Sequence, residues 1–378
     1  MKPSQILVYF EQRLDAITDS IREIVDIESP SHDAVHSREV AGWVEREARK
    51  TGVEVEVERV SVEDGDHLIL RAFPSDINPV LVLGHTDTVH PVGTNQLNPT
   101  RIEGDKLYGC GIFDMKSGIV LMLESLRFFA TTGGKPSRPI TIVLSCDEEV
   151  GSRTGRPIVE REAAKAEYCL VLEPSAAGRV KTGRKGTGNY TLRAHGIPAH
   201  AGLEPEKGAN AIVELSRQIE LINAIANVSV GTTVNVTTIK GGTTSNVIPE
   251  HAECEIDVRF SSMAEAERTD AALRALTPYD DRVSLDLLGG INRPPMERTP
   301  AVVELYKEAR RLAAGFDYKL DETQVGGASD GNFVGALDVP VLDGLGIRGD
   351  GAHTLSEHIL LGDIVRRSTL LTLLLAKY

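Results

Sequence analysis

Short apolar runs alternate with longer segments of helical periodicity in the first half of the chain. Residues 80–83, 140–146 and 168–172 are almost wholly apolar and of strand length, which indicates buried strands. Residues 114–134 carry apolar side chains at helical spacing and end in two glycines that suit a helix C-terminus. This alternation predicts an α/β fold with a mixed, largely parallel sheet flanked by helices.

Two further segments have different periodicities. The first 30 residues place apolar side chains at helical spacing among charges, which predicts an amphipathic helix. From about residue 187 to 295, apolar and polar residues alternate in "TGNYTLRAHG" and "ECEIDVRF", a pattern typical of half-buried antiparallel strands. The stretch "GANAIVELSRQIELINAIA" between them is predicted to be another amphipathic helix. We therefore expect a second domain of a different kind in the middle of the chain.

Length and charge narrow the class of protein. The chain has 378 residues, more than one ordinary hydrophobic core accommodates, which also favours two domains. Its formal net charge of −14 argues against nucleic acid or an anionic membrane as a partner. No apolar stretch approaches the roughly 18–20 residues of a membrane span, and the four cysteines form no CxxC pair. We expect buried, reduced thiols and a soluble, cytoplasmic protein.

Each predicted strand of the first domain is followed by a histidine or a carboxylate. A fourth apolar run, at 339–342, leads through a glycine-rich segment to a histidine in the same way. The residues at these four strand ends are His85, Asp87, Asp147, Glu148, Glu149, Glu173 and His353. Because ligands bind in the crevice beyond the carboxyl ends of parallel strands, we expect these side chains to meet there.

Carboxylates that share a partly closed crevice repel one another unless a cation lies between them. The strand ends carry no lysine or arginine, so a divalent transition metal, zinc by default, is the predicted cation. The ligand set exceeds what one tetrahedral ion uses, so two ions that share one carboxylate fit it better. Asp114, in a glycine-flanked loop at the start of the predicted helix, is the candidate bridge.

Each of these features also has a simpler interpretation. His85 and Asp87 alone fit a turn at a strand end, and the acidic segment 147–149 fits a solvated helix start. Asp114 alone fits a helix N-cap, and His353 alone fits a loop histidine. Their assembly at the ends of separate strands is what favours a metal site.

Several sequence blocks resemble the zinc metallopeptidases that include glutamate carboxypeptidase, acetylornithine deacetylase and succinyl-diaminopimelate desuccinylase. Between about residues 80 and 360 the blocks are, in order, "VLGHTDTVHP", "YGCGIFDMKSG", "LSCDEEVGSRTG", "LVLEPS", "GIPAHAGLEPEKGANAI" and "GAHTLSEHI". The closest resemblance is to glutamate carboxypeptidases, through "GGTTSNVIPEHAECEIDVRF" and "VGGASDGN".

The resemblance implies a role for each residue of the predicted cluster. The implied ligands of two zinc ions are His85, Asp114, Glu149, Glu173 and His353, with Asp114 as the bridge. Cobalt and manganese are alternatives to zinc. Asp87 is implied to orient His85, since metal-bound imidazoles usually donate their other N–H to a carboxylate. Glu148 is implied to be the general base, which takes a proton from the attacking water and returns it to the leaving amine.

The resemblance also implies a domain plan. Residues 1–186 and 296–378 would form a zinc-peptidase-like catalytic domain. Residues 187–295 correspond to an inserted α/β-sandwich domain that acts in dimerisation and as a lid. We therefore expect a homodimer.

Substrate contacts are expected mainly on the inserted domain. His200 is implied to enter the active site of the partner subunit and to stabilise the oxyanion, and Asn246 and Arg259 to contact the substrate carbonyl and carboxylate. An ion pair of Arg259 with Glu255 or Asp257 is the alternative interpretation of that arginine. Further candidate substrate-binding residues are Arg293, Lys185 and Ser329.

These inferences predict hydrolysis of an amide bond next to a free carboxylate, with a small peptide or an N-acyl amino acid as the substrate. A carboxypeptidase that releases glutamate or a similar C-terminal amino acid is the first hypothesis. An N-acyl amino acid deacylase of the acetylornithine or succinyl-diaminopimelate type is the second, and a non-catalytic amino acid or peptide binding protein is the third. A dinucleotide-binding domain is disfavoured, because no strand leads into a G-x-G-x-x-G helix start.

Overall fold

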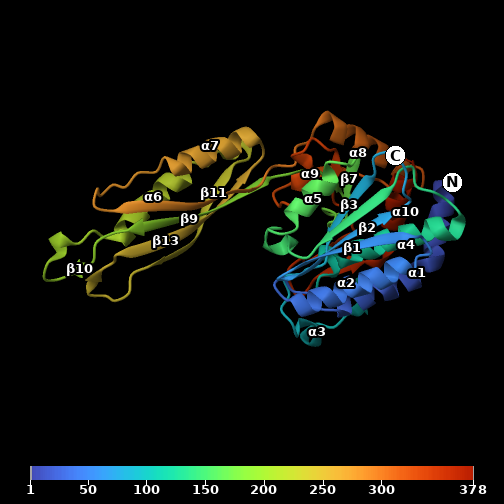
Figure 1. Ribbon diagram of the computed structural model, residues 1–378, viewed down its shortest axis with the longest axis horizontal. Helices are drawn as coiled ribbons and strands as arrows, with labels where there is room; N and C mark the ends of the chain where they lie inside the picture. Colours follow the sequence, from blue (N-terminus) through green and yellow to red (C-terminus); the bar gives the residue numbers. More distant parts are fainter. Residues whose placement is uncertain (1, 378) are drawn as a thin grey trace. The chain divides into compact units, whose positions relative to one another are not determined.

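The computed structural model describes residues 2–377, which form two compact units (Figure 1). The larger unit contains the chain up to Gly183, Arg298–Gln324 and the chain from Ser329 onward. The smaller unit contains Arg184–Glu297 and Val325–Ala328. The larger unit is therefore discontinuous in sequence.

A six-stranded sheet in the order β1-β2-β6-β3-β7-β16 forms the centre of the larger unit. β6, β3, β7 and β16 run parallel, whereas β1 and β2 are antiparallel to their neighbours, which confirms the predicted mixed, largely parallel sheet. The strands are β1 (Val55–Val62), β2 (Gly65–Ala72), β3 (Val80–His85), β6 (Ile140–Ser145), β7 (Tyr168–Val171) and β16 (Val341–Leu342).

Helices cover both faces of this sheet (Figure 1). α1, α4 and α10 pack against one another and share one hydrophobic core with alternate strand residues such as Val82 and Ile142. α5 contacts β6, and α9 contacts β7 next to Val171, which points away from that core. Burial on both faces explains why these strands are continuous apolar runs. The helices are α1 (Pro3–Asp26), α2 (Ala34–Arg49), α3 (Thr94–Leu97), α4 (Ser117–Thr132), α5 (Arg156–Ala163), α8 (Pro300–Ala314), α9 (Gly331–Gly335) and α10 (Leu361–Lys377).

The two helices predicted in this region are confirmed by α1 and α4. α4 ends at Thr132 and is capped by Gly133, whose φ of 67° is the left-handed conformation that glycine adopts without a steric penalty. Short strands complete the larger unit as a four-stranded sheet, β17-β18-β5-β4, and a pair, β15-β8, of which only the last residues, Arg184 and Val325, belong to the smaller unit. They are β4 (Arg101–Glu103), β5 (Lys106–Tyr108), β8 (Val180–Arg184), β15 (Glu322–Val325), β17 (Gly349–Asp350) and β18 (His358–Leu360).

The carboxyl ends of β6, β3 and β7 lie side by side. The three strands are parallel neighbours, with His85 opposite Ser145 and Leu83 opposite Val171. The segments that follow these strands therefore start from one edge of the sheet, as the sequence predicts.

The smaller unit has two layers. A four-stranded antiparallel sheet, β11-β13-β9-β14, carries α6 and α7 on one face, with a hydrophobic core between the layers (Figure 1). The other face is open, so residues along β9 and β13 alternate between buried and exposed, which confirms the predicted pattern. The elements are β9 (Gly186–His195), β10 (Ala199–His200), α6 (Ala211–Ala224), β11 (Thr233–Gly241), β12 (Val247–Ile248), β13 (His251–Phe260), α7 (Met263–Arg274) and β14 (Ser284–Arg293).

The four cysteines are buried with free thiols, as predicted. Among the helices of residues 2–377, none combines the length and the apolar character that crossing a bilayer requires.

Candidate metal centre

His85, the last residue of β3, is held by the segment that follows it. Its Nδ1 lies 3.0 Å from the backbone oxygen of Asp87 and 3.4 Å from the Asp87 carboxylate. That carboxylate also accepts hydrogen bonds from the backbone N–H groups of Glu148 and Glu149, at 3.2 and 3.1 Å, and from the Ser31 hydroxyl at 2.7 Å. Because Nδ1 faces Asp87, the other ring nitrogen, Nε2, is the one that can bind a metal ion, and it faces the other candidate ligands.

The two oxygens of the Asp114 carboxylate face two different imidazoles. Oδ1 lies 3.2 Å from Nε2 of His85, and Oδ2 lies 3.5 Å from Nε2 of His353. Each histidine also has its own glutamate. Glu173 Oε1 is 3.4 Å from His85 Nε2, and Glu149 Oε2 is 3.3 Å from His353 Nε2. The five predicted ligands thus lie together in the larger unit, in two groups that share Asp114.

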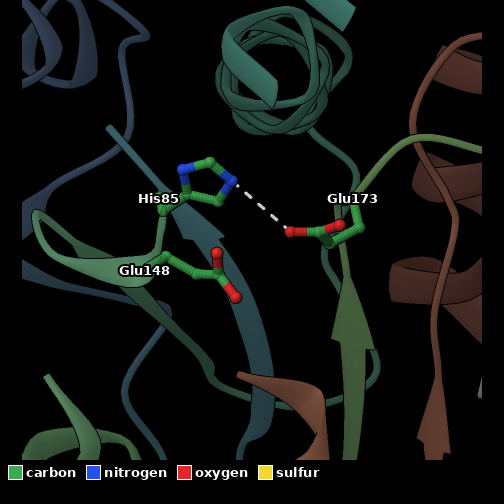
Figure 2. A group of neighbouring side chains, drawn as sticks. All are labelled: His85, Glu148 and Glu173. Carbon is green, nitrogen blue, oxygen red and sulfur yellow. Dashed lines mark ion pairs between the residues drawn. The ribbon is translucent and has the colours of Figure 1, made fainter. Parts of the chain in front are cut away.

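Glu148 lies beside the first of these groups. Ligand atoms of His85, Glu148 and Glu173 lie within 4.8 Å of one another, and so do those of His85, Asp114 and Glu149. Figure 2 shows the carboxylates of Glu148 and Glu173 directed toward one space beside the His85 ring. Glu148 begins a short 3₁₀ turn and is buried, which excludes the solvated helix start considered for this glutamate.

The carboxylates of the cluster favour positive charge on its histidines. Hydrogen bonds to Asp114 and Glu149 raise the pKa of His353 to about 10. Burial by itself lowers the pKa of His85, but hydrogen bonds to three carboxylates outweigh it and raise that pKa well above its usual value. Burial opposes ionisation of Asp114, yet hydrogen bonds from the two histidines hold its pKa below its usual value. Burial raises the pKa of the Glu149 carboxyl.

The donor set fits a divalent transition metal. Oε1 of Glu149 is buried and has no hydrogen-bond partner among the described residues, which is costly for a carboxylate oxygen unless a cation contacts it. The other ligand atoms are imidazole Nε2 atoms and carboxylate oxygens, which zinc, cobalt and manganese accept. A metal ion among these groups would supply the positive charge that two protonated imidazoles otherwise provide.

Glu357, which was not among the residues predicted from the sequence, joins segments that carry candidate ligands. Its buried carboxylate accepts hydrogen bonds from the backbone N–H groups of Gly111, Phe113 and Asp114, at 2.9, 2.8 and 3.0 Å. Its Oε2 also lies 2.8 Å from Nε2 of His90, on the segment that follows β3. The only sequence signal was its position in the block "GAHTLSEHI", because most of its partners are backbone groups.

A lysine from outside the strand ends also reaches the cluster. Lys181, on β8, has its Nζ 4.0 Å from Glu173 Oε2 and 3.9 Å from Asp343 Oδ1. Asp343 in turn accepts a hydrogen bond of 2.8 Å from the hydroxyl of Ser329, which is fully buried. The structure therefore places Ser329, a predicted substrate contact, at the start of a polar chain that leads to Glu173.

The arginines predicted to bind substrate lie in the smaller unit. Arg259 and Arg293 stand opposite Thr187 from its two sides, at one end of the sheet. Arg259 forms hydrogen bonds of 2.7–3.0 Å with the carboxylate of Asp257, so the ion pair considered as its alternative is present. Lys185 immediately precedes β9 and donates its backbone N–H to the oxygen of residue 325.

His200 ends β10, and Asn246 immediately precedes β12, the strand that pairs with β10. The backbone oxygen of Asn246 accepts a hydrogen bond of 2.9 Å from the N–H of Ala201. Nδ1 of His200 accepts hydrogen bonds of 3.1 Å from the N–H groups of Gly202 and Leu203. These bonds leave the proton of a neutral ring on Nε2, on an exposed side chain.

The sequence of this chain is similar to those of known proteins. The model of peptidase family M20/M25/M40 matches residues 81–377. Carboxypeptidase G2 from Pseudomonas sp. (strain RS-16) is 29% identical over 368 residues, which cover 93% of this chain and 86% of that protein. Succinyl-diaminopimelate desuccinylase from Delftia acidovorans (strain DSM 14801 / SPH-1) is 31% identical over 309 residues, which cover 76% of this chain and 78% of that protein.

Solved structures share the fold. Aminopeptidase PepT from Bacillus cereus ATCC 10987 has a TM-score of 0.78 at 20% identity, over 96% of this chain and 98% of that chain. A metallo-carboxypeptidase of the M20 family from Sulfolobus solfataricus has a TM-score of 0.71 at 16% identity, over 95% and 98% of the two chains. The family model spans most of the sequence, so this chain belongs to peptidase family M20/M25/M40 and is a hydrolase of the metallopeptidase and amidohydrolase type.

Proposed function

We propose that this chain hydrolyses an amide bond next to a free carboxylate, as a dinuclear-metal carboxypeptidase that releases glutamate or a similar C-terminal amino acid. The observation that carries the proposal is Asp114, whose two oxygens face His85 and His353, each with its own glutamate. This arrangement offers each of two divalent ions a histidine, a glutamate and one oxygen of a shared carboxylate. Zinc is the proposed metal, with cobalt and manganese as alternatives.

Glu148 is the proposed proton carrier. Bound metal ions would lower the pKa of a water molecule to about 7 and polarise the substrate carbonyl. The Glu148 carboxylate takes the proton of that water and then donates it to the nitrogen of the leaving amine. Asp87 supports this step, because it faces His85 Nδ1 and also holds the backbone N–H groups of Glu148 and Glu149. A single carboxylate thus positions both a metal ligand and the base.

A free carboxylate on the substrate is proposed from the arginines of the smaller unit. Arg259 and Arg293 flank Thr187, and a guanidinium binds a carboxylate through two parallel hydrogen bonds. The chain as a whole has a net charge of −14, so two neighbouring arginines form a local positive region that favours an anionic ligand. Asp257 pairs with Arg259 at 2.7 Å, and the substrate carboxylate would compete for this arginine.

Initial rates on matched substrates test this proposal. An N-acyl glutamate and a dipeptide that ends in glutamate should both be hydrolysed. The same compounds with an α-carboxamide should react about 10- to 100-fold more slowly, because they forfeit a charge-assisted contact. Equal rates with and without the α-carboxylate would exclude the carboxylate requirement.

An N-acyl amino acid deacylase is the second candidate, favoured by the 31% identity to a succinyl-diaminopimelate desuccinylase. The two candidates share the same chemistry and differ in the acyl group. Comparison of kcat/KM for N-succinyl, N-acetyl and peptide substrates with one common amine product separates them. A higher kcat/KM for an N-acyl compound than for every peptide would select the deacylase.

The smaller unit is proposed to act in dimerisation and as a lid, with His200 donated to the partner subunit. Because Nδ1 of His200 accepts two backbone N–H groups, its Nε2–H is available to donate to an oxyanion, next to Asn246. We also propose a cytoplasmic location, from the four buried free thiols.

Mixing two inactive variants is expected to restore activity. His200→Ala removes the donated histidine and Glu148→Gln removes the base, so a mixed dimer would contain one site with both groups intact. Rates before and after subunit exchange, with sedimentation to confirm the dimer, provide the measurement. No recovery from an exchanged dimer would show that each site is built within one chain.

Metal-free protein is expected to lose stability as the pH rises. Carboxylates raise the pKa of His353 to about 10 and that of His85 well above its usual value. A histidine with a higher pKa in the folded chain contributes stability below its unfolded pKa of about 6.5, and this is lost as the pH rises through the folded value. Thermal unfolding in chelator should show a falling midpoint between pH 6.5 and 10, and zinc should raise and flatten it. A midpoint that climbs across this window in chelator would contradict the prediction.

A further inference from the structure

The open face of the smaller unit carries two histidines side by side. His195, the last residue of β9, stands directly opposite His251, the first residue of β13. Their ring centroids are 5.3 Å apart at an interplanar angle of 79°, so the rings meet at an edge rather than stacking. The two Nδ1 atoms lie 3.3 Å from each other.

The other nitrogen of each ring faces a carboxylate. His195 Nε2 lies 3.2 Å from Asp286 Oδ2 on β14, and His251 Nε2 lies 3.7 Å from Glu250 Oε2. A carboxylate next to Nε2 favours a proton on that nitrogen and leaves the lone pair on Nδ1. Two Nδ1 lone pairs at 3.3 Å repel each other unless a proton or a metal ion lies between them.

We propose that His195 and His251 bind a divalent transition-metal ion of the zinc, nickel or copper type through their Nδ1 atoms. With bonds of 2.0–2.1 Å and a tetrahedral angle, two such nitrogens are separated by about 3.3–3.4 Å, which matches the separation of the pair. Asp286 and Glu250 then serve as the outer carboxylates that fix the tautomer of each ring, an arrangement common at metal-binding histidines.

The surroundings leave room for the remaining ligands of such an ion. Both histidines line a concavity of about 570 Å³, together with Arg193, Lys240 and Glu253. Arg193 is paired with Glu253 at 3.1 Å, so its charge is largely compensated. Water or a small anion can therefore complete the coordination in this concavity.

This site is separate from the arginines proposed to bind substrate. His251 and Arg259 lie at opposite ends of β13, eight residues apart, which corresponds to about 26 Å in an extended strand. The inference therefore does not rest on the proposed hydrolysis.

Metal stoichiometry of the full-length chain tests the proposal. Equilibrium dialysis at buffered free Zn²⁺ should give one equivalent more for the wild type than for His195→Ala or His251→Ala. His32→Ala is the matched control, because His32 is an exposed histidine that faces a carboxylate, Asp64, at 3.3 Å. This control should keep the wild-type stoichiometry.

Copper spectroscopy supplies a second readout. Electron paramagnetic resonance of the Cu²⁺-loaded wild type should show a signal from a copper ion with two coordinating nitrogens, and this signal should be absent from either histidine variant. Unchanged stoichiometry and unchanged spectra in both variants would overturn the proposal and reduce the pair to an imidazole–imidazole hydrogen bond. His251 has a side chain that is 68% exposed, so its replacement reports on binding even where the His195 variant folds poorly. The test compares the number of metal ions bound by the wild type with the number bound by each variant. It therefore remains valid even if the cluster in the larger unit binds no metal.

Discussion

Replacing Glu148 with glutamine is expected to reduce amide hydrolysis about 10²- to 10⁴-fold while the bound metal is retained, which is the usual contribution of a general base. Glutamine keeps the size of the side chain but neither takes up nor returns the proton. The backbone N–H of Glu148 donates a hydrogen bond of 3.2 Å to the Asp87 carboxylate, and a change of the Glu148 side chain leaves this bond in place. The turn that carries Glu148 and Glu149 should therefore keep its conformation.

The neighbouring residue provides the matched control for this prediction. Oε2 of Glu149 lies 3.3 Å from His353 Nε2, and its Oε1 is buried without a hydrogen-bond partner among the described residues, so Glu149→Gln should lose metal. Metal content by elemental analysis and kcat on the same preparations separate the two effects. A Glu148→Gln variant with wild-type kcat, or one that loses metal as Glu149→Gln does, would contradict the assignment. The family membership disfavours the third hypothesis, a non-catalytic binding protein.

Replacing Glu357 with glutamine is expected to weaken metal binding about 10- to 100-fold, the range typical for groups that orient metal ligands. The Glu357 carboxylate accepts three backbone N–H groups of the Asp114 loop and contacts His90. A glutamine keeps one acceptor oxygen and turns its NH₂ group toward a backbone N–H that the carboxylate oxygen had accepted. The Asp114 carboxylate is then held less firmly between His85 and His353.

A second buried glutamate, Glu124, provides the control that separates weaker metal binding from a general loss of stability. Glu124 on α4 is equally buried, and its carboxylate is held by Arg13 at 2.6 and 3.0 Å and by Arg127 at 3.0 Å. Glu124→Gln should lower the unfolding midpoint without changing metal affinity, whereas Glu357→Gln should change both. Chelator competition and thermal unfolding provide the two measurements. Equal metal affinities for the two variants would reduce Glu357 to a structural residue.

The sequence predicts best the location of the candidate metal ligands that lie at strand ends. β3, β6 and β7 are buried on both faces, so their apolar runs show where each strand ends, and the residue that follows must lie at the sheet edge. His85 and Glu173 are located in this way. Asp114 and His353 were candidates from their positions near the same edge, but their specific ligand roles came from the family resemblance, because both lie in irregular segments. His353 has a φ of 65°, which periodicity does not reveal.

Two contacts of the site are not indicated by any sequence pattern. Glu357 binds backbone groups 243 to 246 residues earlier in the chain. Lys181 is close to Glu173 in sequence, but it contacts that residue from the next strand, β8. Neither contact has a local sequence pattern. The ion pair of Arg259 with Asp257 was predictable as an alternative, because residues two apart in a strand project from the same face.

The order of the candidate ligands along the chain constrains when the centre can form during biosynthesis. Four of them, from His85 to Glu173, are translated before the smaller unit begins at Arg184, whereas His353 and Glu357 follow it. A nascent polypeptide that has just completed the insertion still lacks one imidazole and the residue that fixes the bridging loop. A metal ion that uses His353 as a ligand can therefore be bound only after the whole smaller unit has been synthesised.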